Sequence, residues 1–455
     1  MIEGQTSIFE MLYPTYKITK PIRLIEFFAG YGSQALALKY LEVNFEHWKI
    51  CEWAVKSIQA YKDLHFGEDT RDYSKGIETG QIKEFLLNKG ISSNYNEPMS
   101  KEQINRLSEH QARTIYNNIK ATHNLVNIQQ VKGADLEIVD ADKYDYILTY
   151  SFPCQDLSLA GTRKLMSDTS TRSGMLWEVE RILTECKELG TMPQILLMEN
   201  VPQVHGEGAK EDFNKWQLRL EELGYKNYWQ DLIATDYGIP QTRNRCFMVS
   251  ILGDYNYTFP KPVPLKLKLK DILEDNVNDN YYLTDKQINE IKQWNAYQKP
   301  LETMEQTKKS GNSPTLTTRS GAYAAGMILI DEKYYLSNKM INYIVSKDDK
   351  YKVNENNLII NRKLACSKTT REGNTRADTS DYICRDLPEN TNLKDSKKKN
   401  LKIRKLTPRE MFRLMGVKDE DYDKVAINQS DSSLYHLAGD SIVVNVLMAI
   451  FREMI

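Results

Sequence analysis

Short apolar runs alternate with amphipathic segments over the first 255 residues of the chain. Compact apolar runs predict strands, whereas apolar positions three and four apart predict helices. The predicted strands are residues 22–28, 47–51, 144–150, 194–198 and 246–252, and the clearest helices are residues 34–41, 101–120, 174–189 and 213–223. Strands that alternate with helices predict an α/β fold with a doubly wound, mostly parallel sheet.

Beyond residue 260 the pattern changes. Prolines 260, 262 and 264 predict a linker, and residues 265–400 are polar and lack regular alternation. Helices return at residues 408–415 and 442–454. We therefore predict a first domain over residues 1–260 with an insertion at 68–130, a smaller irregular, strand-rich domain over 261–400, and a return of residues 401–455 to the first domain. The closing helix is expected to pack by the first strand.

Composition narrows the class of protein. The 455 residues are 41% apolar and 27% charged, an ordinary mixture for a soluble protein of two domains. Six cysteines without a CxxC pair predict neither a disulfide framework nor a metal site. We find no signal peptide and no apolar run that would span a bilayer, so we expect a cytoplasmic protein. The net charge of -1 does not predict nucleic-acid binding, and the basic runs at 261–270 and 394–405 are either solvated surface or phosphate contacts.

Residues with the potential for catalysis lie directly after predicted strands. The run SFPCQDLS at 151–158 follows the strand at 144–150, so a stiff Pro-Cys backbone presents the Cys154 thiol. Open α/β sheets bind their ligands at this edge. Cysteine is also often a buried packing residue, so the residues alone leave both roles open for Cys154.

A glycine turn joins the first predicted strand to the first helix. The stretch FFAGYGS at 27–33 would let backbone approach a nucleotide-like ligand, but it lacks the third glycine of GxGxxG, which disfavours a dinucleotide fold. Glu52 ends the second strand, where such folds hold ribose hydroxyls, and Trp53 could stack on a purine. A surface carboxylate beside a core tryptophan is the alternative.

Six stretches, in this order, resemble the DNA cytosine-C5 methyltransferase family. They are FFAGYGS at 27–33, SFPCQDLS at 151–158, MENV at 198–201, QTRNR at 241–245, RKLTPRE at 404–410 and GDSIVVNVL at 439–447. The resemblance covers the chain except residues 68–130 and much of 265–400. It implies an S-adenosylmethionine-dependent fold and an enzyme, a DNA (cytosine-5-)-methyltransferase, that methylates cytosine C5 in a specific double-stranded DNA sequence. The target base would flip out of the duplex.

The resemblance also implies catalytic roles. Cys154 matches the nucleophile that adds to cytosine C6, and Glu199 matches the carboxylate that binds the N3 and N4 edge. Arg243 matches the arginine that supports the flipped base, and Arg245 is its companion. No metal is implied.

The remaining implied contacts divide between cofactor and DNA. The cofactor contacts are Phe28, Ala29, Gly30, Gly32, Ser33, Glu52, Trp53, Asp135, Leu136, Pro153 and Ser441. The DNA contacts are Gln155, Ser158, Arg172, Gln241, Thr315, Leu316 and Arg404. Asp135 would accept the adenine amine, residues 155–172 would form a lid, and Asp440 departs from the asparagine of many members. The Thr315-Leu316 element lies further before RKLTPRE than is usual in the family.

Partners and alternatives complete the expectations. We expect a monomer that acts on DNA, within a bacterial or phage restriction-modification system or as an orphan enzyme, with any restriction endonuclease encoded separately. A tRNA cytosine-C5 methyltransferase is one alternative, which the large 265–400 region disfavours. A catalytically silent DNA-binding homologue is another, which the presence of Cys154, Glu199 and Arg243 disfavours. The sequence does not reveal the DNA target.

Overall fold

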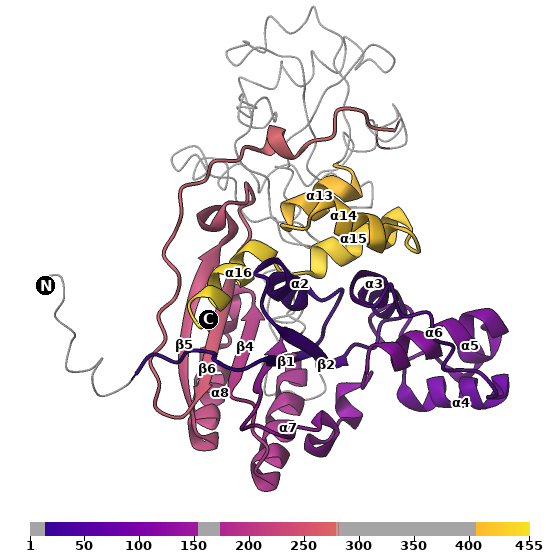
Figure 1. Cartoon of the computed structure of the whole chain (residues 1–455), viewed down its shortest axis with the longest axis horizontal. Coiled ribbons are helices and arrows are strands. Elements are labelled where there is room, and N and C mark those ends of the chain that lie inside the picture. Colours follow the sequence, from indigo (N-terminus) through magenta and orange to yellow (C-terminus); the bar gives the residue numbers. More distant parts are fainter. Residues whose placement is uncertain (1–13, 153–172, 279–280, 282–405) are drawn as a thin grey trace, which may run out of the picture.

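The computed structural model describes residues 14–152, 173–278, 281 and 406–455. Its centre is a six-stranded sheet in the order β2-β1-β3-β4-β6-β5 (Figure 1). The strands are β1 (Ile22–Phe27), β2 (Phe45–Cys51), β3 (Asp145–Tyr150), β4 (Ile195–Asn200), β5 (Tyr225–Ile233) and β6 (Asn244–Leu252). β2, β1, β3 and β4 are parallel, whereas β6 runs antiparallel to both β4 and β5. The predicted mostly parallel α/β sheet is therefore confirmed.

Helices cover both faces of the sheet. One face packs against α2 (Ser33–Tyr40) and α16 (Val444–Arg452), and the other against α7 (Leu176–Leu189) and α8 (Lys210–Leu223). β1 and β3 are buried at every position, because alternate side chains enter the two cores. This double burial explains their nearly continuous apolar sequences.

Residues 68–130 extend from the β2 edge of the sheet (Figure 1). After α3 (Val55–His65) the chain forms α4 (Thr79–Lys89), α5 (Lys101–Arg106) and α6 (Glu109–Ala121), which share a small apolar cluster with α3. Backbone hydrogen bonds around Ser92 tie the loop after α4 to Trp53 and Val55. The region predicted as an insertion thus contacts the end of β2.

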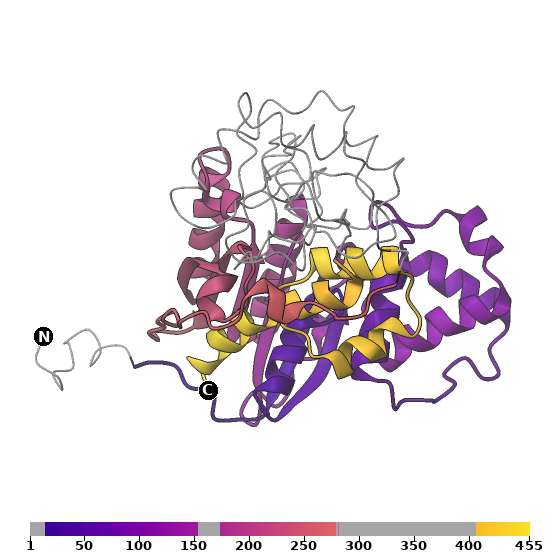
Figure 2. The same ribbon diagram turned by 90° about the horizontal axis from the view of Figure 1, so that it is seen from above.

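The C-terminal segment returns to the sheet domain (Figures 1 and 2). It comprises α13 (Pro408–Leu414), α14 (Asp419–Ala426), α15 (Asp431–Asp440) and α16. α16 packs on α2, the helix that follows β1, and the Ile18 amide donates to the Met454 carbonyl at 2.6 Å. The stretch Asp431–Arg452 is long and apolar enough to cross a membrane by length and composition, contrary to our expectation from the sequence. Its apolar window is 72% buried within the protein, as in a core helix.

The structure differs from the predicted elements in three places. β5 was not predicted, because this edge strand is only partly buried and has no continuous apolar run. The helix predicted at 101–120 is two helices, because Ser108 caps α6 by accepting from the Gln111 amide. β4 continues to Asn200, so Glu199 lies within the strand rather than after it. Short 3-10 helices span Ile128–Gln130, Gly133–Leu136, Ser173–Met175, Pro202–His205, Ala234–Tyr237 and Leu269–Ile272.

Candidate active site

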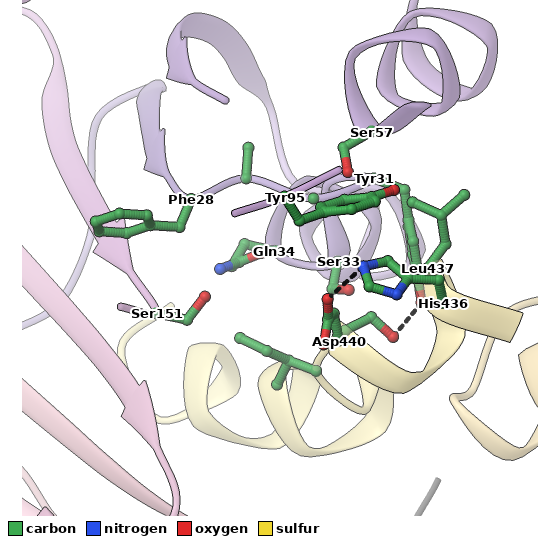
Figure 3. Close-up of a pocket in the computed structure, with 14 residues that line it drawn as sticks. Phe28, Tyr31, Ser33, Gln34, Ser57, Tyr95, Ser151, His436, Leu437 and Asp440 are labelled. Atoms are coloured by element: carbon green, nitrogen blue, oxygen red, sulfur yellow. Dashed lines mark hydrogen bonds and ion pairs between the residues drawn. The ribbon is translucent and has the colours of Figure 1, made fainter. Parts of the chain in front are cut away.

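A pocket lies at the carboxyl ends of β1 and β3, where the strand order reverses (Figure 3). Phe27 and Tyr150 are register partners at this edge. Open α/β sheets bind ligands at this switch point. Lining residues come from the turn after β1, from α3, from the loop after α4, from the end of β3 and from α15. They are Phe28, Ala29, Gly30, Tyr31, Ser33, Gln34, Ser57, Tyr95, Ser151, His436, Leu437, Asp440, Ser441 and Ile442.

The turn after β1 has a backbone that suits close approach of a ligand. Phe28, Gly30 and Gly32 have φ values of 57°, 56° and 83°, in the left-handed region. A Cβ at Gly30 would meet nothing within 4 Å, whereas one at Gly32 would lie 2.5 Å from the His65 Nε2 atom. Gly30 therefore leaves open space beside the pocket, and Gly32 allows α2 to pack against α3.

Glu52 joins the ends of β1 and β2. Its carboxylate accepts hydrogen bonds from the Gly30 amide at 2.9 Å and the Ala54 amide at 2.8 Å. Burial raises the pKa of Glu52 to about 7, although the backbone donors favour the charged form. Trp53 follows it and packs against the apolar cluster of α3 to α6. Glu52 therefore lies beside the glycine turn, and its role as a ribose acceptor stays a prediction.

The turn between α15 and α16 meets the same pocket. The Tyr31 hydroxyl donates to the Ser441 Oγ atom at 2.9 Å. The buried Arg243 guanidinium donates to the carbonyls of Gly439 at 3.2 Å and Ser441 at 2.9 Å. Hydrogen bonds to Ser441 from Tyr31 and from Arg243 thus bring three segments that are far apart in the sequence together at this pocket.

The end of β4 carries a second group of polar side chains, apart from those around Glu52. The Arg245 Nε atom lies 3.1 Å from a Glu199 carboxylate oxygen, and both side chains are largely buried. Burial raises the pKa of Glu199, against the opposing effects of Arg245 and Arg243. The Asn200 amide nitrogen donates to the Phe152 carbonyl at 3.1 Å. This bond holds the end of β4 beside the chain that leads into Pro153.

Several predicted site residues are not brought to the pocket. Asp135 is exposed and caps its own 3-10 turn by accepting from the Lys132 amide at 2.8 Å. Leu136 is fully buried in the core beneath α7. The GADL stretch is a turn that packs on α7, and neither residue lines the described pocket, so the cofactor role of Asp135 and Leu136 stays a prediction without support from this pocket. Gln241 is fully buried and donates to the Leu414 carbonyl at 2.6 Å, which gives it a structural contact rather than exposure to DNA.

Other predicted residues lie outside the described part of the chain. They are Pro153, Cys154, Gln155, Ser158, Arg172, Thr315, Leu316 and Arg404. Their roles, and the lid expected at residues 155–172, stay predictions.

The structure also reveals site residues that sequence reasoning missed. Asn124 lies beside Glu52, because its carbonyl accepts from the Glu52 amide at 3.1 Å and its amide donates to the Glu52 carbonyl at 2.9 Å. Tyr95 and His436 line the pocket. Asn124 follows α6 and Tyr95 precedes α5, and no local motif marked either residue. Only the tertiary contacts of the insertion bring them to the end of β2.

Glu26 on β1 is a further buried carboxylate, beneath the glycine turn. It accepts from the Tyr61 hydroxyl at 2.5 Å and the Ala35 amide at 3.2 Å. Burial raises the pKa of Glu26 to about 7. It therefore supports the start of α2 from below the pocket.

One group of described residues has the spacing of metal ligands. The ligand atoms of His205, Asp231 and Cys246 lie within 4.8 Å of one another. His205 and Asp231 are hydrogen-bonded at 2.9 Å, which accounts for their proximity without an ion. The expectation that no metal is needed stays a prediction.

Comparisons with known proteins agree on one family. Residues 89–455 match the family described as C-5 cytosine-specific DNA methylase. The chain is 30% identical to the type II methyltransferase M2.ScrFI of Lactococcus lactis subsp. cremoris, over 95% of this chain and 99% of the relative. It is 36% identical to the orphan methyltransferase M.SssI of Spiroplasma monobiae, over 59% of this chain and 68% of the relative.

Solved structures show the same fold. The DNMT2 protein of Spodoptera frugiperda superimposes with a TM-score of 0.54 at 16% identity, over 95% of this chain and 99% of the other. The Dnmt2 methyltransferase of S. pombe gives a TM-score of 0.53 at 15% identity, over 95% and 97%. The sheet and its helices are therefore a methyltransferase fold.

Proposed function

Because the chain belongs to the C-5 cytosine-specific DNA methylase family, we propose that it transfers a methyl group from S-adenosylmethionine to cytosine in a specific double-stranded DNA sequence. Membership makes it a DNA (cytosine-5-)-methyltransferase of the restriction-modification type, which includes orphan enzymes. The cofactor, the covalent mechanism and base flipping are parts of the proposal. So are DNA as the binding partner and the role of residues 261–400 as a target-recognition domain.

The observation that carries the proposal is the pairing of Glu199 with Arg245 at the end of β4. Asn200 bonds to the Phe152 carbonyl, so this buried ion pair lies beside the segment that enters Pro153-Cys154. Burial raises the pKa of the Glu199 carboxyl, so it holds or shares a proton more readily than an exposed carboxyl does. Activation of a cytosine ring needs such a carboxyl together with the nucleophile, the role that we propose for Cys154.

The residues of the pocket fit a sulfonium nucleoside cofactor. The Glu52 carboxylate offers acceptors for ribose hydroxyls, and the turn at Gly30 leaves room for backbone to contact the ligand. Asp440 lines this pocket and is half exposed, so its carboxylate gives the pocket a negative charge that suits a cation. Phe28, Ser33 and Ser441 would hold the rest of the ligand. When bound, S-adenosylmethionine supplies an electrophilic methyl group.

The chain's own residues would prepare the cytosine. Cytosine C5 is a poor nucleophile, so the Cys154 thiolate adds to C6 and places electron density on C5 and N3. Glu199 donates a hydrogen bond or a proton at N3 and stabilises that charge, while Arg245 orients the carboxyl group. C5 then takes the methyl group. Loss of the C5 proton and β-elimination of the thiolate complete the reaction and restore Cys154.

A base inside a duplex cannot present its C6 atom to a protein thiol, so the target must leave the stack. Arg243 would support the displaced base. It also bonds to the α15–α16 turn, so one side chain would connect the base site with the cofactor pocket.

Methyl transfer to nucleic acid tests the proposal. The full chain is incubated with methyl-labelled S-adenosylmethionine and, separately, with unmethylated duplex DNA of mixed sequence and with tRNA. We expect label in duplex DNA, at 5-methylcytosine after nucleoside digestion, and none in tRNA. Label only in tRNA would support the tRNA alternative, and label in neither polymer would contradict the enzymatic assignment.

Bisulfite sequencing defines the target. DNA from cells that express the chain should show protected cytosines within one short sequence, and cells that express Cys154→Ala should show none. Protection at scattered cytosines without a shared sequence would contradict the site-specific part of the proposal.

A further inference from the structure

Three side chains form one wall of the cofactor pocket (Figure 3). The Tyr95 and His436 rings lie 3.9 Å apart between centroids, at an interplanar angle of 42°. The His436 Nε2 atom lies 3.0 Å from an Asp440 carboxylate oxygen. We call this set the Tyr95–His436–Asp440 wall. It combines the insertion with α15 and shares no residue with the glycine turn or with Glu52.

The loop that carries Tyr95 is held in a strained conformation. Tyr95 has a φ of 63°, which is costly for a residue with a side chain and is typical of functional positions. The Asn94 side chain accepts from the Asn96 amide at 3.0 Å and the Glu97 amide at 3.2 Å, which fixes the turn. The Ser92 amide donates to the Trp53 carbonyl at 2.8 Å. Tyr95 is therefore positioned relative to the end of β2, next to Glu52.

The charge of Asp440 acts on two buried carboxylates of the site, Glu52 and Glu199. Burial is the main cause of the raised pKa of Glu52 at the end of β2 and of Glu199 at the end of β4, and the charge of Asp440 adds to it. Its own side chain is about half exposed, at 53%, so it can reach a ligand in the pocket. A ligand bound between Glu52 and Glu199 therefore lies within the field of Asp440.

We propose that the Tyr95–His436–Asp440 wall recognises the positive charge of the sulfonium cofactor and discriminates it from the neutral thioether product. This inference rests on the proposed function. Methyl transfer removes the sulfonium charge, so a wall that stabilises a cation binds the donor more tightly than S-adenosylhomocysteine. The Asp440 carboxylate attracts the charge directly, and the Tyr95 ring presents a negative face to it. His436 is a positioning residue, because its ring contacts the Tyr95 ring in a tilted arrangement and its Nε2 atom orients the Asp440 carboxylate.

Calorimetric titration of the full chain with each ligand tests the inference without turnover. The variant Asp440→Asn keeps the shape of the side chain and removes its charge. We expect its affinity for S-adenosylmethionine to fall by about three- to tenfold, as for a partly hydrated charge at close range. The affinity for S-adenosylhomocysteine should change by no more than about twofold, since its uncharged sulfur gains little from the carboxylate.

Three further variants separate the effect of charge from the effect of side-chain shape. Glu420→Gln removes an exposed carboxylate on α14 that does not line the pocket, so the affinity ratio of the two ligands should not change. Tyr95→Phe keeps the aromatic face and should preserve the ratio within about twofold, whereas Tyr95→Leu should lower it, because only an aromatic ring attracts a cation in this way. Thermal unfolding of each variant confirms that it is folded.

The outcomes distinguish the inference from the function on which it rests. If the wild-type chain binds neither ligand, the proposed function fails. If the wild-type chain binds both ligands and Asp440→Asn leaves their affinity ratio unchanged, the wall does not discriminate the charged ligand from the neutral one. The inference is then overturned. If the ratio narrows with Asp440→Asn and stays constant with Glu420→Gln, the inference is supported.

Discussion

Glu52 and Glu199 are buried carboxylates at the same edge of the sheet, but different groups hold them. Glu52 accepts from two backbone amides, whose positions are set by β1, β2 and the start of α3. Glu199 faces the side-chain guanidinium of Arg245 and the charge of Arg243. Burial raises the pKa of both groups. The first arrangement suits a fixed acceptor for a ligand, and the second suits a group whose protonation changes during a reaction.

Because different groups hold these two carboxylates, we expect the two regions of the site to have different functions. The region around Glu52 would bind the cofactor, and the region around Glu199 would activate the base. Arg243 belongs to both regions, because it lies in the segment before Arg245 and bonds to the Ser441 carbonyl beside the pocket. Substitutions should therefore affect binding, turnover or both according to region.

The largest expected effect is that of Glu199→Gln. Without an ionisable carboxyl group at N3, kcat should fall by about 10²- to 10⁴-fold, the usual contribution of general acid-base catalysis. The dissociation constant of S-adenosylmethionine should stay unchanged. Steady-state kinetics and calorimetry measure the two quantities, with Glu221→Gln on the exposed face of α8 as the control. An equal loss in kcat and in cofactor affinity would contradict the assignment of base activation to the Glu199 region and cofactor binding to the Glu52 region.

Glu52→Gln should show the opposite pattern. Loss of a charged acceptor should weaken cofactor binding by about 10- to 100-fold, as for a hydrogen bond to a charged group. At saturating cofactor, kcat should change little, because Glu52 does not contact the base in this account. A reduced kcat at saturation with unchanged cofactor affinity would contradict the assignment of Glu52.

Arg243→Lys should affect both regions moderately. Lysine keeps the charge but lacks the planar guanidinium, whose Nη2 atom donates to the carbonyls of both Gly439 and Ser441. We expect losses of about tenfold in cofactor affinity and in kcat, because each hydrogen bond to a charged group contributes about 1.5–3 kcal/mol. Arg245→Lys is the matched variant and should lower kcat alone. Identical profiles for the two variants would show that Arg243 does not connect the regions.

Glu26, which supports the glycine turn, should affect stability rather than cofactor binding or turnover. Its pKa is raised in the folded state to about 7 from 4.5, so its contribution to stability is fully present below pH 4.5 and is lost as the pH rises through about 7. Glu26→Gln should therefore gain stability relative to wild type by up to about 3 kcal/mol between pH 5 and pH 8. Urea unfolding at both pH values measures the difference. A constant difference between the two proteins would show that Glu26 does not titrate in this range.

The sequence predicted the sheet because its central strands are buried on both faces and read as apolar runs. It missed β5, since an edge strand that contacts solvent carries polar residues such as Lys226 and Gln230. Glu52 lies beside the turn that follows β1, because β2 is adjacent to β1 and Glu52 directly follows β2. Its role as a ribose acceptor stays a prediction.

Residues outside the strands were harder to place from the sequence. Asp135 matched a short pattern, but its turn packs on α7 and away from the pocket. Asn124 and Tyr95 reach the site only because the apolar cluster of α3 to α6 fixes the insertion against the end of β2. A polar segment without a motif carries no local signal of such a contact, so the structure was needed to find it.

The most direct test of the central claim is a covalent trap. Duplex DNA that contains the target sequence with 5-fluorocytosine is incubated with the full chain and S-adenosylmethionine, because fluorine at C5 blocks the final elimination. We predict a complex that survives denaturation, with the DNA attached to the peptide that contains Cys154, and no complex with Cys154→Ser. An active wild-type enzyme that forms no complex, or one attached through another residue, would contradict the account.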